Sequence, residues 1–468
     1  MNLPHCSNVR SATRLAIVSL LAMSFMAACS DAVQPTEPPA PAQAVSAASA
    51  DVVVSNAAEL VAALAPEHAG QRILVPAGTY AINAPLTVPD GATLEGEGVM
   101  QFDGAGLPTG FASGTGTILS MTTNTPGNLL TLGNGASIRG LEIVDLPGRA
   151  GNVVAVVSRD AGDRVSATIA ESEIVNPNSL GVGPDGSTGY GLLIVTRNLN
   201  LGADPAPHEG AALTARVVRS LIRSPAGGGG LFAFNFASLG RVSVALSDNI
   251  VGGEVTANGG VSRPDAVHDA TVGIESQRNL YRNDSPDPCA SLPRGGWNLT
   301  GGSGPPAPLP VPETARNSLR VHSVDDRIEG FTTAVAATGS RRFFPSPIAG
   351  PSTDNSIELQ LLGGTISTPS CAGAQFVADL DLEGAATADD ALVPGDGNSV
   401  RAVIRGVTGS GPRFNRYANA AGPAGPLAPA FQGTGNILEI VGSPVAFAQT
   451  NRHIDPAPGA GFFTARTP

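Results

Sequence analysis

A base, an acid and a cation occur close together in residues 319–330, LRVHSVDDRIEG. If the apolar residues of this segment point into a core, alternation along a strand turns Arg320, His322 and Asp326 outward, with Asp325 at the corner. A histidine, a carboxylate and an arginine on one surface can move a proton and neutralise a uronate carboxylate, which is the chemistry of polysaccharide cleavage. The segment is therefore a candidate catalytic site. The alternative is a solvated face whose charges pair with each other.

Two further segments combine arginine with aromatic residues. Guanidinium groups bind carboxylates through paired hydrogen bonds, and aromatic rings pack on the faces of sugars. We therefore expect these segments to bind an acidic glycan, unless their side chains pack back on the body of the fold. The candidate binding residues are Arg341, Arg342, Phe343, Arg413, Phe414, Arg416 and Tyr417.

Calcium is the one cofactor that the sequence suggests. Residues 379–396 carry acidic side chains and no basic one, and carboxylate oxygens are ligands for calcium. Their spacing matches no calcium loop, so the alternative is charge that keeps the chain soluble. No other metal site is predicted, because His68, His208, His268 and His453 are isolated in the sequence. The acidic residues are Asp379, Asp381, Glu383, Asp389, Asp390 and Asp396.

The charge composition excludes several classes of function. The chain contains no lysine, so all 27 basic residues are arginine, and Schiff-base chemistry, a P-loop and a lysine general base are excluded. The net charge of -12 argues against nucleic acid or an anionic membrane surface as the main partner, since both are negatively charged and bind positively charged protein surfaces.

The N-terminal segment predicts export. Residues 1–28 carry Arg10 and Arg14 before a short apolar run, which is typical of a signal peptide. The run ends in Met-Ala-Ala-Cys29, which resembles a bacterial lipobox; an ordinary signal peptide is the alternative. The resemblance implies lipidation of Cys29, a Pro/Ala-rich tether over residues 29–50, and an outer-membrane lipoprotein in the periplasm or at the cell surface. Contact with the membrane would run through the lipid anchor only.

Two of the four cysteines are available for a disulfide after such processing, because Cys6 leaves with the signal peptide and Cys29 is lipidated. Cys289 and Cys371 lie in segments that contain proline, and an exported protein meets an oxidising compartment. A disulfide between them is therefore possible, and two unpaired thiols are the alternative.

The elements that must position these residues are short strands. Residues 73–98, ILVPAGTYAINAPLTVPDGATLEGEG, hold β-favouring runs of only a few residues between Gly, Pro and Asp turn signals. Such runs suit a chain that turns a corner every few residues and lays each strand on the next coil, which is a parallel β-solenoid. A charged fraction of only 14% and a Gly-plus-Pro share of about a fifth fit many turns around an apolar interior.

A short helix is expected to cover the first coil. Asn56 and Glu59 form a capping pair ahead of an apolar stripe made by Leu60, Val61 and Leu64. Covering the terminal coil protects its open edge from pairing with another chain. We expect the solenoid to span residues 51–455 and residues 456–468 to form a flexible tail.

This opening resembles that of right-handed parallel β-helix proteins with the pectate lyase-like fold, including alginate lyase-like and chondroitinase B-like enzymes. The matching residues are Glu59, Leu60, Ala63, Leu64, Ile73, Val75, Gly78, Tyr80, Gly91, Leu94, Gly96 and Gly98. The resemblance implies an all-β, single-stranded right-handed parallel β-helix of about nine or ten coils with a short N-terminal capping helix.

The catalytic signatures of these enzymes do not accompany the fold. The polygalacturonase pattern is represented only by Asp-Asp pairs at 325–326 and 389–390, and the lysine base of the alginate lyase-like enzymes is absent. We therefore expect a monomer that binds an extended polysaccharide or cell-surface glycan, or that has a structural or adhesive role. The alternative is a polysaccharide lyase or glycoside hydrolase that acts on an acidic glycan through a divergent site.

Overall fold

The computed structural model describes most of the chain beyond the predicted tether. The described residues are 52–180, 189–197, 208–262, 265–289, 295–304, 313–342, 352–369, 378–383, 397–409, 413–416, 436–442 and 461–466.

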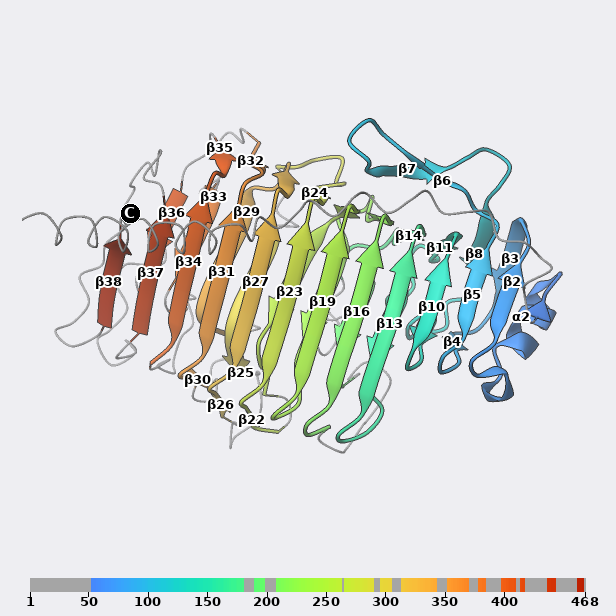
Figure 1. The fold of residues 1–468 in the computed structure, drawn as a ribbon, viewed down its shortest axis with the longest axis horizontal. Coiled ribbons are helices and arrows are strands. Elements are labelled where there is room, and N and C mark those ends of the chain that lie inside the picture. Colours follow the sequence, from blue (N-terminus) through green and yellow to red (C-terminus); the bar gives the residue numbers. More distant parts are fainter. Residues whose placement is uncertain are drawn as a thin grey trace, which may run out of the picture. The chain divides into compact units, whose positions relative to one another are not determined.

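Three long parallel sheets make up the fold, and the chain visits them in turn (Figure 1). The first sheet contains β1 (Val52–Val53), β2 (Arg72–Val75), β5 (Thr93–Gly96), β10 (Ala136–Arg139), β13 (Arg164–Ala170), β16 (Ala212–Val218), β19 (Arg241–Ser247), β23 (Thr271–Gln277), β27 (Ser318–Val324), β31 (Ser356–Leu362), β34 (Ser399–Arg405), β37 (Asn436–Gly442) and β38 (Gly461–Arg466). The second sheet contains β3 (Gly78–Ile82), β8 (Thr117–Met121), β11 (Leu141–Val144), β14 (Glu173–Val175), β17 (Leu221–Arg223), β20 (Ile250–Gly252), β24 (Leu280–Arg282), β28 (Arg327–Glu329), β32 (Thr365–Ser367) and β35 (Thr408–Gly409). The third sheet contains β4 (Leu86–Val88), β9 (Leu130–Leu132), β12 (Val154–Val157), β15 (Tyr190–Val195), β18 (Gly229–Phe234), β21 (Glu254–Asn258), β25 (Gly295–Gly304), β29 (Thr333–Arg342), β33 (Ala378–Glu383) and β36 (Arg413–Arg416).

This order defines a right-handed parallel β-helix, which confirms the predicted fold class. Each coil contributes one strand to each sheet and pairs with the coils before and after it, as β10 does with β5 and β13. The second and third sheets have 10 strands each, in line with the expected coil number, and the first sheet has 13. Its last strand, β38, lies inside residues 456–468, so the segment expected to be a tail contributes a strand to the sheet.

The interior is a single apolar core made by alternating residues of all three sheets. On β27, for example, Leu319 and Val321 are buried while Arg320 is exposed. The inward side chains of each strand thus stack on their equivalents in the next coil, and the stacking removes continuous apolar columns from water.

The short helix α2 (Ala57–Ala63) begins as predicted. The Asn56 side chain accepts a hydrogen bond from the Glu59 backbone N–H at 2.9 Å, and the Glu59 carboxylate accepts one from the Ser55 N–H at 2.8 Å. Leu60 and Leu64 join the core, whereas Val61, expected on the same stripe, is 49% exposed. A 3₁₀ turn, η2 (Pro66–His68), follows. No helix among the described residues is long and apolar enough to cross a membrane.

Two smaller sheets lie beside the coils. One is formed by β22 (Val267–His268), β26 (Thr314–Ala315) and β30 (Ser352–Thr353). The other is an antiparallel hairpin of β6 (Met100–Phe102) and β7 (Pro108–Phe111), which leaves the coil after β5 and returns to it at β8. Figure 1 shows this β6–β7 hairpin lying outside the coils.

Candidate functional site

The four residues of the predicted catalytic segment do not converge on one site. Arg320 and His322 project from the outer face of β27, and the His322 ring lies 2.9 Å from the Glu275 carboxylate on the neighbouring strand. Arg320 is in register with Glu358 on β31. Asp325 is exposed at the corner after β27, where its φ is 55°. The outer face of the first sheet thus places acidic side chains beside its basic ones, as the alternative interpretation expected.

The prediction that Asp326 faces outward is wrong, because its side chain is buried in the corner. One carboxylate oxygen accepts hydrogen bonds from the hydroxyls of Ser276 and Ser323, each at 2.6 Å, and the other accepts from the Asn279 N–H at 2.7 Å. Burial raises the pKa of Asp326, although these hydrogen bonds oppose the shift. Alternation fails here because Asp325 turns through the left-handed region and rotates the next side chain inward.

Asp326 continues a ladder that runs along the same corner. The Asn249 N–H donates to the Asn279 side-chain oxygen at 2.8 Å, just as the Asn279 N–H donates to Asp326. Each side chain therefore satisfies a backbone donor of the preceding coil, and the ladder is a structural feature of the fold.

The two predicted binding segments are only partly described. Arg341 and Arg342 end β29, and Arg413, Phe414 and Arg416 lie in β36; the structure describes the backbone of these residues and not their side chains. Phe343 and Tyr417 lie outside the described residues, as does Cys29. Their predicted roles stay predictions.

The predicted disulfide and calcium site are also only partly covered. Cys289 is disulfide-bonded, while Cys371 lies outside the described residues, so their pairing stays a prediction. Asp379, Asp381 and Glu383 lie on β33 without described side chains, and the other members of the acidic run lie outside the described part. Within the described part, no group of three or more His, Cys, Asp or Glu side chains is arranged to hold a metal ion.

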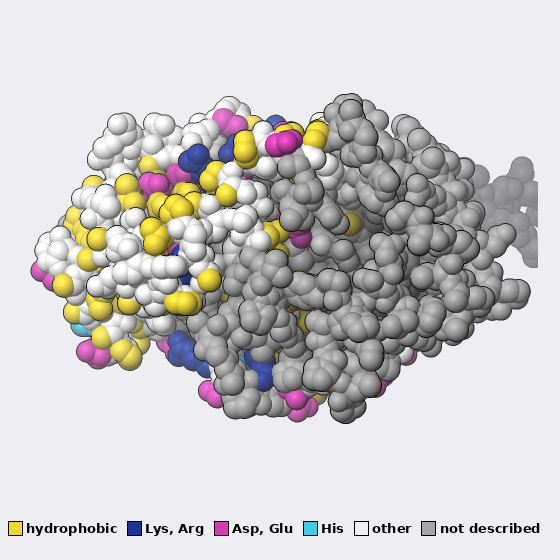
Figure 2. All heavy atoms as spheres, turned by 180° about the vertical axis from the view of Figure 1, so that it is seen from behind, with side chains coloured by type: hydrophobic (Ala, Val, Ile, Leu, Met, Phe, Trp, Pro, Cys, Tyr) yellow, Lys and Arg dark blue, Asp and Glu magenta, His cyan; other side chains and the backbone are white. Residues whose placement is uncertain are grey.

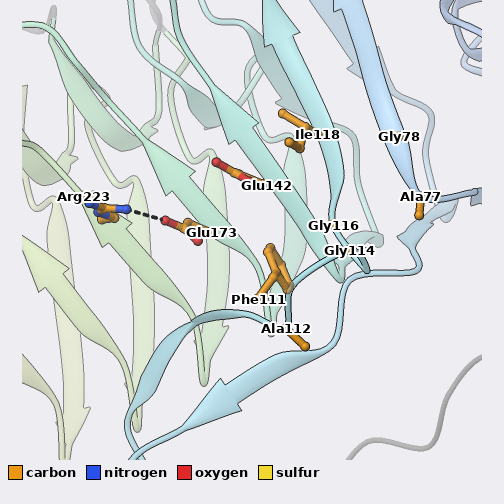
Figure 3. Close-up of a pocket in the computed structure, with 10 residues that line it drawn as sticks. All are labelled: Ala77, Gly78, Phe111, Ala112, Gly114, Gly116, Ile118, Glu142, Glu173 and Arg223. Carbon is orange, nitrogen blue, oxygen red and sulfur yellow. Dashed lines mark hydrogen bonds and ion pairs between the residues drawn. The ribbon is translucent and has the colours of Figure 1, made fainter.

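A cavity of about 600 Å³ lies where the β6–β7 hairpin meets the second sheet. Ile118, Glu142, Glu173 and Arg223 line it from the strands of the sheet, and Phe111 lines it from the end of the hairpin. Figure 3 shows the two glutamates on neighbouring strands, with Phe111 beside them. This hairpin pocket is the candidate functional site.

The two glutamates interrupt an outer column of the second sheet that is otherwise apolar around them. Glu142 is in register with Ile118 on one side and with Glu173 on the other. Glu173 is followed in the same column by Leu221 and then Ile250. Apolar side chains fill the equivalent positions in the neighbouring coils, so the sheet does not require two carboxylates at these positions.

The environments of the two carboxylates differ sharply. Arg223 donates a hydrogen bond to the Glu173 carboxylate at 3.0 Å, and the Glu173 side chain is only 7% exposed. Among the described residues, Glu142 has no hydrogen-bonding or ion-pair partner. Burial raises the pKa of Glu142, and the negative charge of Glu173 raises it further, while Arg223 lowers it. The pair therefore combines a half-buried carboxyl whose pKa is raised with a carboxylate that is paired with a cation.

The hairpin is anchored on both sides of the pocket. Leu107 at its tip is buried against Leu221, Ile250 and Leu280, which form an apolar cluster outside the main core. Near β6, the Arg219 guanidinium lies 5.5 Å from the centroid of the Phe102 ring, within the range of a cation–π contact. These contacts hold the hairpin over the outer face of the second sheet.

Sequence reasoning missed the pocket although a signal was present. Residues 142–144 and 173–175 both read Glu-Ile-Val, on strands where the isoleucine enters the core. The repeat of an outward glutamate at the same strand position identifies a stacked pair. Finding it requires the register of the coils, and the length of the loops between the strands obscures that register.

The three phenylalanines of the Phe-rich stretch 231–236, Phe232, Phe234 and Phe236, are buried. The rings of Phe232 and Phe234 stack, at 3.7 Å between centroids. They belong to a separate buried cluster, since Leu231 and Ala233 take the inward positions of β18.

The charged side chains on the outer surface are scattered. Over the coloured part of the face in Figure 2, basic side chains occur in small separate groups among acidic and hydrophobic ones. That part of the surface offers no extended basic patch.

No protein-family model and no curated protein matches this chain. Similar solved structures include the catalytic unit of a thermostable GH87 alpha-1,3-glucanase from Streptomyces thermodiastaticus strain HF3-3, at 14% identity over 91% of this chain and 69% of that one, with a TM-score of 0.29. They also include the Dettilon tailspike protein gp208, at 11% identity over 75% of this chain and 63% of that one, with a TM-score of 0.30. The assignment of a parallel β-helix rests on the three sheets themselves.

Proposed function

We propose that this protein is an exported, lipid-anchored β-helix that binds a neutral polysaccharide in the hairpin pocket. The observation that carries the proposal is a cavity of about 600 Å³ in which two carboxyl groups, a guanidinium group and an aromatic ring converge. This volume lies within the range of about 300–1,000 Å³ that is usual for ligand sites.

The lining suits the chemistry of a sugar. Carboxylate oxygens of Glu142 and Glu173 can accept hydrogen bonds from hydroxyl groups, and Arg223 can donate them. The Phe111 ring supplies an apolar surface against which the C–H face of a sugar ring can pack. A glycan that extends past the pocket would continue over the outer face of the second sheet.

A neutral glycan fits this pocket better than an acidic one. Arg223 is the one cation of the lining and is already paired with Glu173, so no unpaired cation is left there for a uronate carboxylate. The Glu173 carboxylate and the net charge of -12 on the chain would repel such a group. The acidic glycan expected from the arginine-rich segments is therefore not proposed for this site.

Export and anchoring are proposed on the sequence of residues 1–29. A signal peptide followed by a lipidated Cys29 would place the β-helix in the cell envelope, as an outer-membrane lipoprotein. Incorporation of radiolabelled palmitate into the wild-type protein but not into the Cys29→Ala variant tests this part of the proposal. Equal labelling of both proteins would contradict it.

Calorimetric titration of the purified full-length protein tests the binding proposal. The probes are soluble oligosaccharides of α-1,3-, β-1,3- and β-1,4-linked glucose, xylo-oligosaccharides, and oligogalacturonate as the acidic comparison. We expect a neutral oligosaccharide to bind and Phe111→Ala to weaken its binding about tenfold or more, equal to about 1.4 kcal/mol. Glu358→Gln on the outer face of the first sheet is the control and should bind as the wild type does. Preference for oligogalacturonate, or binding of no probe, would overturn the proposal.

A further inference from the structure

We propose that Glu142 and Glu173 hydrolyse the glycosidic bond of the bound glycan with retention of anomeric configuration, Glu142 as general acid and base and Glu173 as nucleophile. This inference rests on the proposed function, since it requires a sugar in the hairpin pocket. It goes further because it assigns a reaction to Glu142 and Glu173. Binding of a sugar alone would not require these two residues to have different environments.

The first support is the spacing of the two residues. Glu142 and Glu173 are in-register partners on the adjacent parallel strands β11 and β14. Neighbouring strands lie about 4.8 Å apart, so both side chains leave the sheet at that separation and on the same face. Retaining glycosidases place their carboxyl groups about 5–5.5 Å apart, whereas inverting enzymes need about 6.5–9.5 Å to hold a water molecule. The strand spacing that separates this stacked pair is therefore closer to the retaining separation than to the inverting one.

The second support is the difference in partners. Glu173 is held by an ion pair with Arg223 at 3.0 Å, which fixes the position of its carboxylate group. Glu142 is half-buried, without a partner among the described residues, and next to a negative charge, and these conditions raise its pKa, as a general acid requires. Two neighbouring carboxyl groups, one without a partner and one paired with a cation, divide into an acid and a nucleophile.

The third support is the loss of folding stability that the Glu142 carboxyl causes at this position. A half-buried carboxyl without a partner destabilises a folded protein, and an apolar side chain at position 142 would continue the column formed by Ile118, Leu221 and Ile250. Polar groups retained at such a cost are characteristic of functional sites.

The reaction balances with water as the only co-reactant. In the first step the Glu142 carboxyl gives its proton to the glycosidic oxygen, a Glu173 carboxylate oxygen bonds to the anomeric carbon, and the bond from that carbon to the leaving sugar breaks. In the second step the Glu142 carboxylate takes a proton from water, whose oxygen bonds to the anomeric carbon as the ester bond to Glu173 breaks. Both glutamates return to their starting states.

The test uses the neutral oligosaccharide that binds in the titration. The purified full-length protein and its Glu142→Gln, Glu173→Gln and Glu358→Gln variants are incubated with it. New reducing ends are counted, and the anomer that forms first is identified by proton NMR. Circular dichroism and binding of the same oligosaccharide establish that each variant is folded and holds the sugar.

We expect the wild type and Glu358→Gln to release reducing ends at equal rates, with the original anomer formed first. Glu142→Gln and Glu173→Gln should each lower the rate about 100-fold or more while binding the sugar within about tenfold of the wild type. Azide should restore cleavage to a Glu173→Ala variant, because a small anion can occupy the space of the carboxylate and attack the anomeric carbon.

Three results would overturn the inference. Binding without release of reducing ends by the wild type would leave the protein a glycan-binding β-helix and remove the catalytic assignment. Cleavage that persists after either substitution would show that the substituted residue is not catalytic. A first product of inverted anomeric configuration would show that the mechanism is not a retaining one. If no oligosaccharide binds at all, the proposed function itself fails, and the inference fails with it.

Discussion

The Phe111 ring lies directly against Gly98, in the space that a side chain at position 98 would occupy. A Cβ atom on Gly98 would come within 2.7 Å of the Phe111 Cε1 atom and within 2.5 Å of the Gly140 carbonyl oxygen. Gly98 is one of the residues by which the sequence resembles pectate lyase-like proteins. In this chain, its lack of a side chain lets the hairpin close onto the second sheet and complete the pocket.

Replacing Gly98 by alanine should therefore open the pocket. The added methyl group must displace the Phe111 ring or the backbone at Gly140, and overpacking of this kind costs about 1–3 kcal/mol. We expect lower stability in urea unfolding together with weaker glycan binding. Gly104→Ala is the matched control, because nothing lies within 4 Å of a Cβ at that hairpin position. Equal effects of the two substitutions would contradict the role assigned to Gly98.

The tip of the hairpin provides a second prediction. Leu107 is buried against Leu221, Ile250 and Leu280, and these contacts attach the hairpin to the outer face of the second sheet. Leu107→Ala should cost about 2–5 kcal/mol if the site cannot collapse, or detach the hairpin locally. Detachment would show as faster hydrogen exchange at the hairpin amides with unchanged exchange in the coils. Exchange that stays slow at the hairpin would show that other contacts hold it.

The protonation of Glu142 provides a third prediction. Burial and the charge of Glu173 raise the pKa of Glu142 above 4.5, Arg223 opposes them, and the hairpin residues that line the pocket are uncharged. The folded state thus binds the proton more tightly than the unfolded state, so stability is full below pH 4.5 and falls as the pH rises through the raised pKa.

Glu142→Gln should remove this loss of stability. We expect its Tm to exceed that of the wild type at pH 8 and to equal it near pH 4, as measured by thermal unfolding across that range. A difference in Tm that is the same at both pH values would mean that the ionisation of Glu142 does not affect stability. Glu358→Gln should show no such dependence on pH.

Much of the fold could be predicted from the sequence, because its signals are local. Short runs such as those in residues 73–98 and the capping pair of Asn56 and Glu59 each depend on neighbouring residues only. The candidate site could not be predicted in the same way. Glu142 meets Glu173 only through the register of successive coils, and a tertiary contact at Leu107 places the hairpin over them.

The corner residue Asp326 shows where local reasoning fails. The alternation of side chains along a strand predicted that Asp326 faces outward. The left-handed conformation of Asp325 instead rotates the Asp326 side chain inward, where it joins the ladder of Asn249 and Asn279. Asp326→Asn should extend that ladder, with a change in unfolding free energy within about 1 kcal/mol, since the serine hydroxyls can turn to accept hydrogen bonds. Asp326→Ala should cost about 1–3 kcal/mol, because the Asn279 N–H loses its acceptor. A loss of glycan cleavage in a stable Asp326→Asn variant would instead support the catalytic role first predicted for Asp326.

The most costly single substitutions should fall at a different corner, where Arg149 and Asp145 form an ion pair that is fully removed from solvent. Arg149 donates to the Asp145 carboxylate at 2.8 Å and to the Asn152 carbonyl at 2.9 Å, and it also binds the Gly127 carbonyl. Asp145→Ala leaves a buried guanidinium without its counter-charge and should cost about 3–5 kcal/mol in urea unfolding. Asp145→Ala combined with Arg149→Met should cost less than the sum of the two single changes, since the unpaired charge disappears. Additive losses would show that the hydrogen bonds of Arg149 to the backbone, and not the ion pair, hold this corner together.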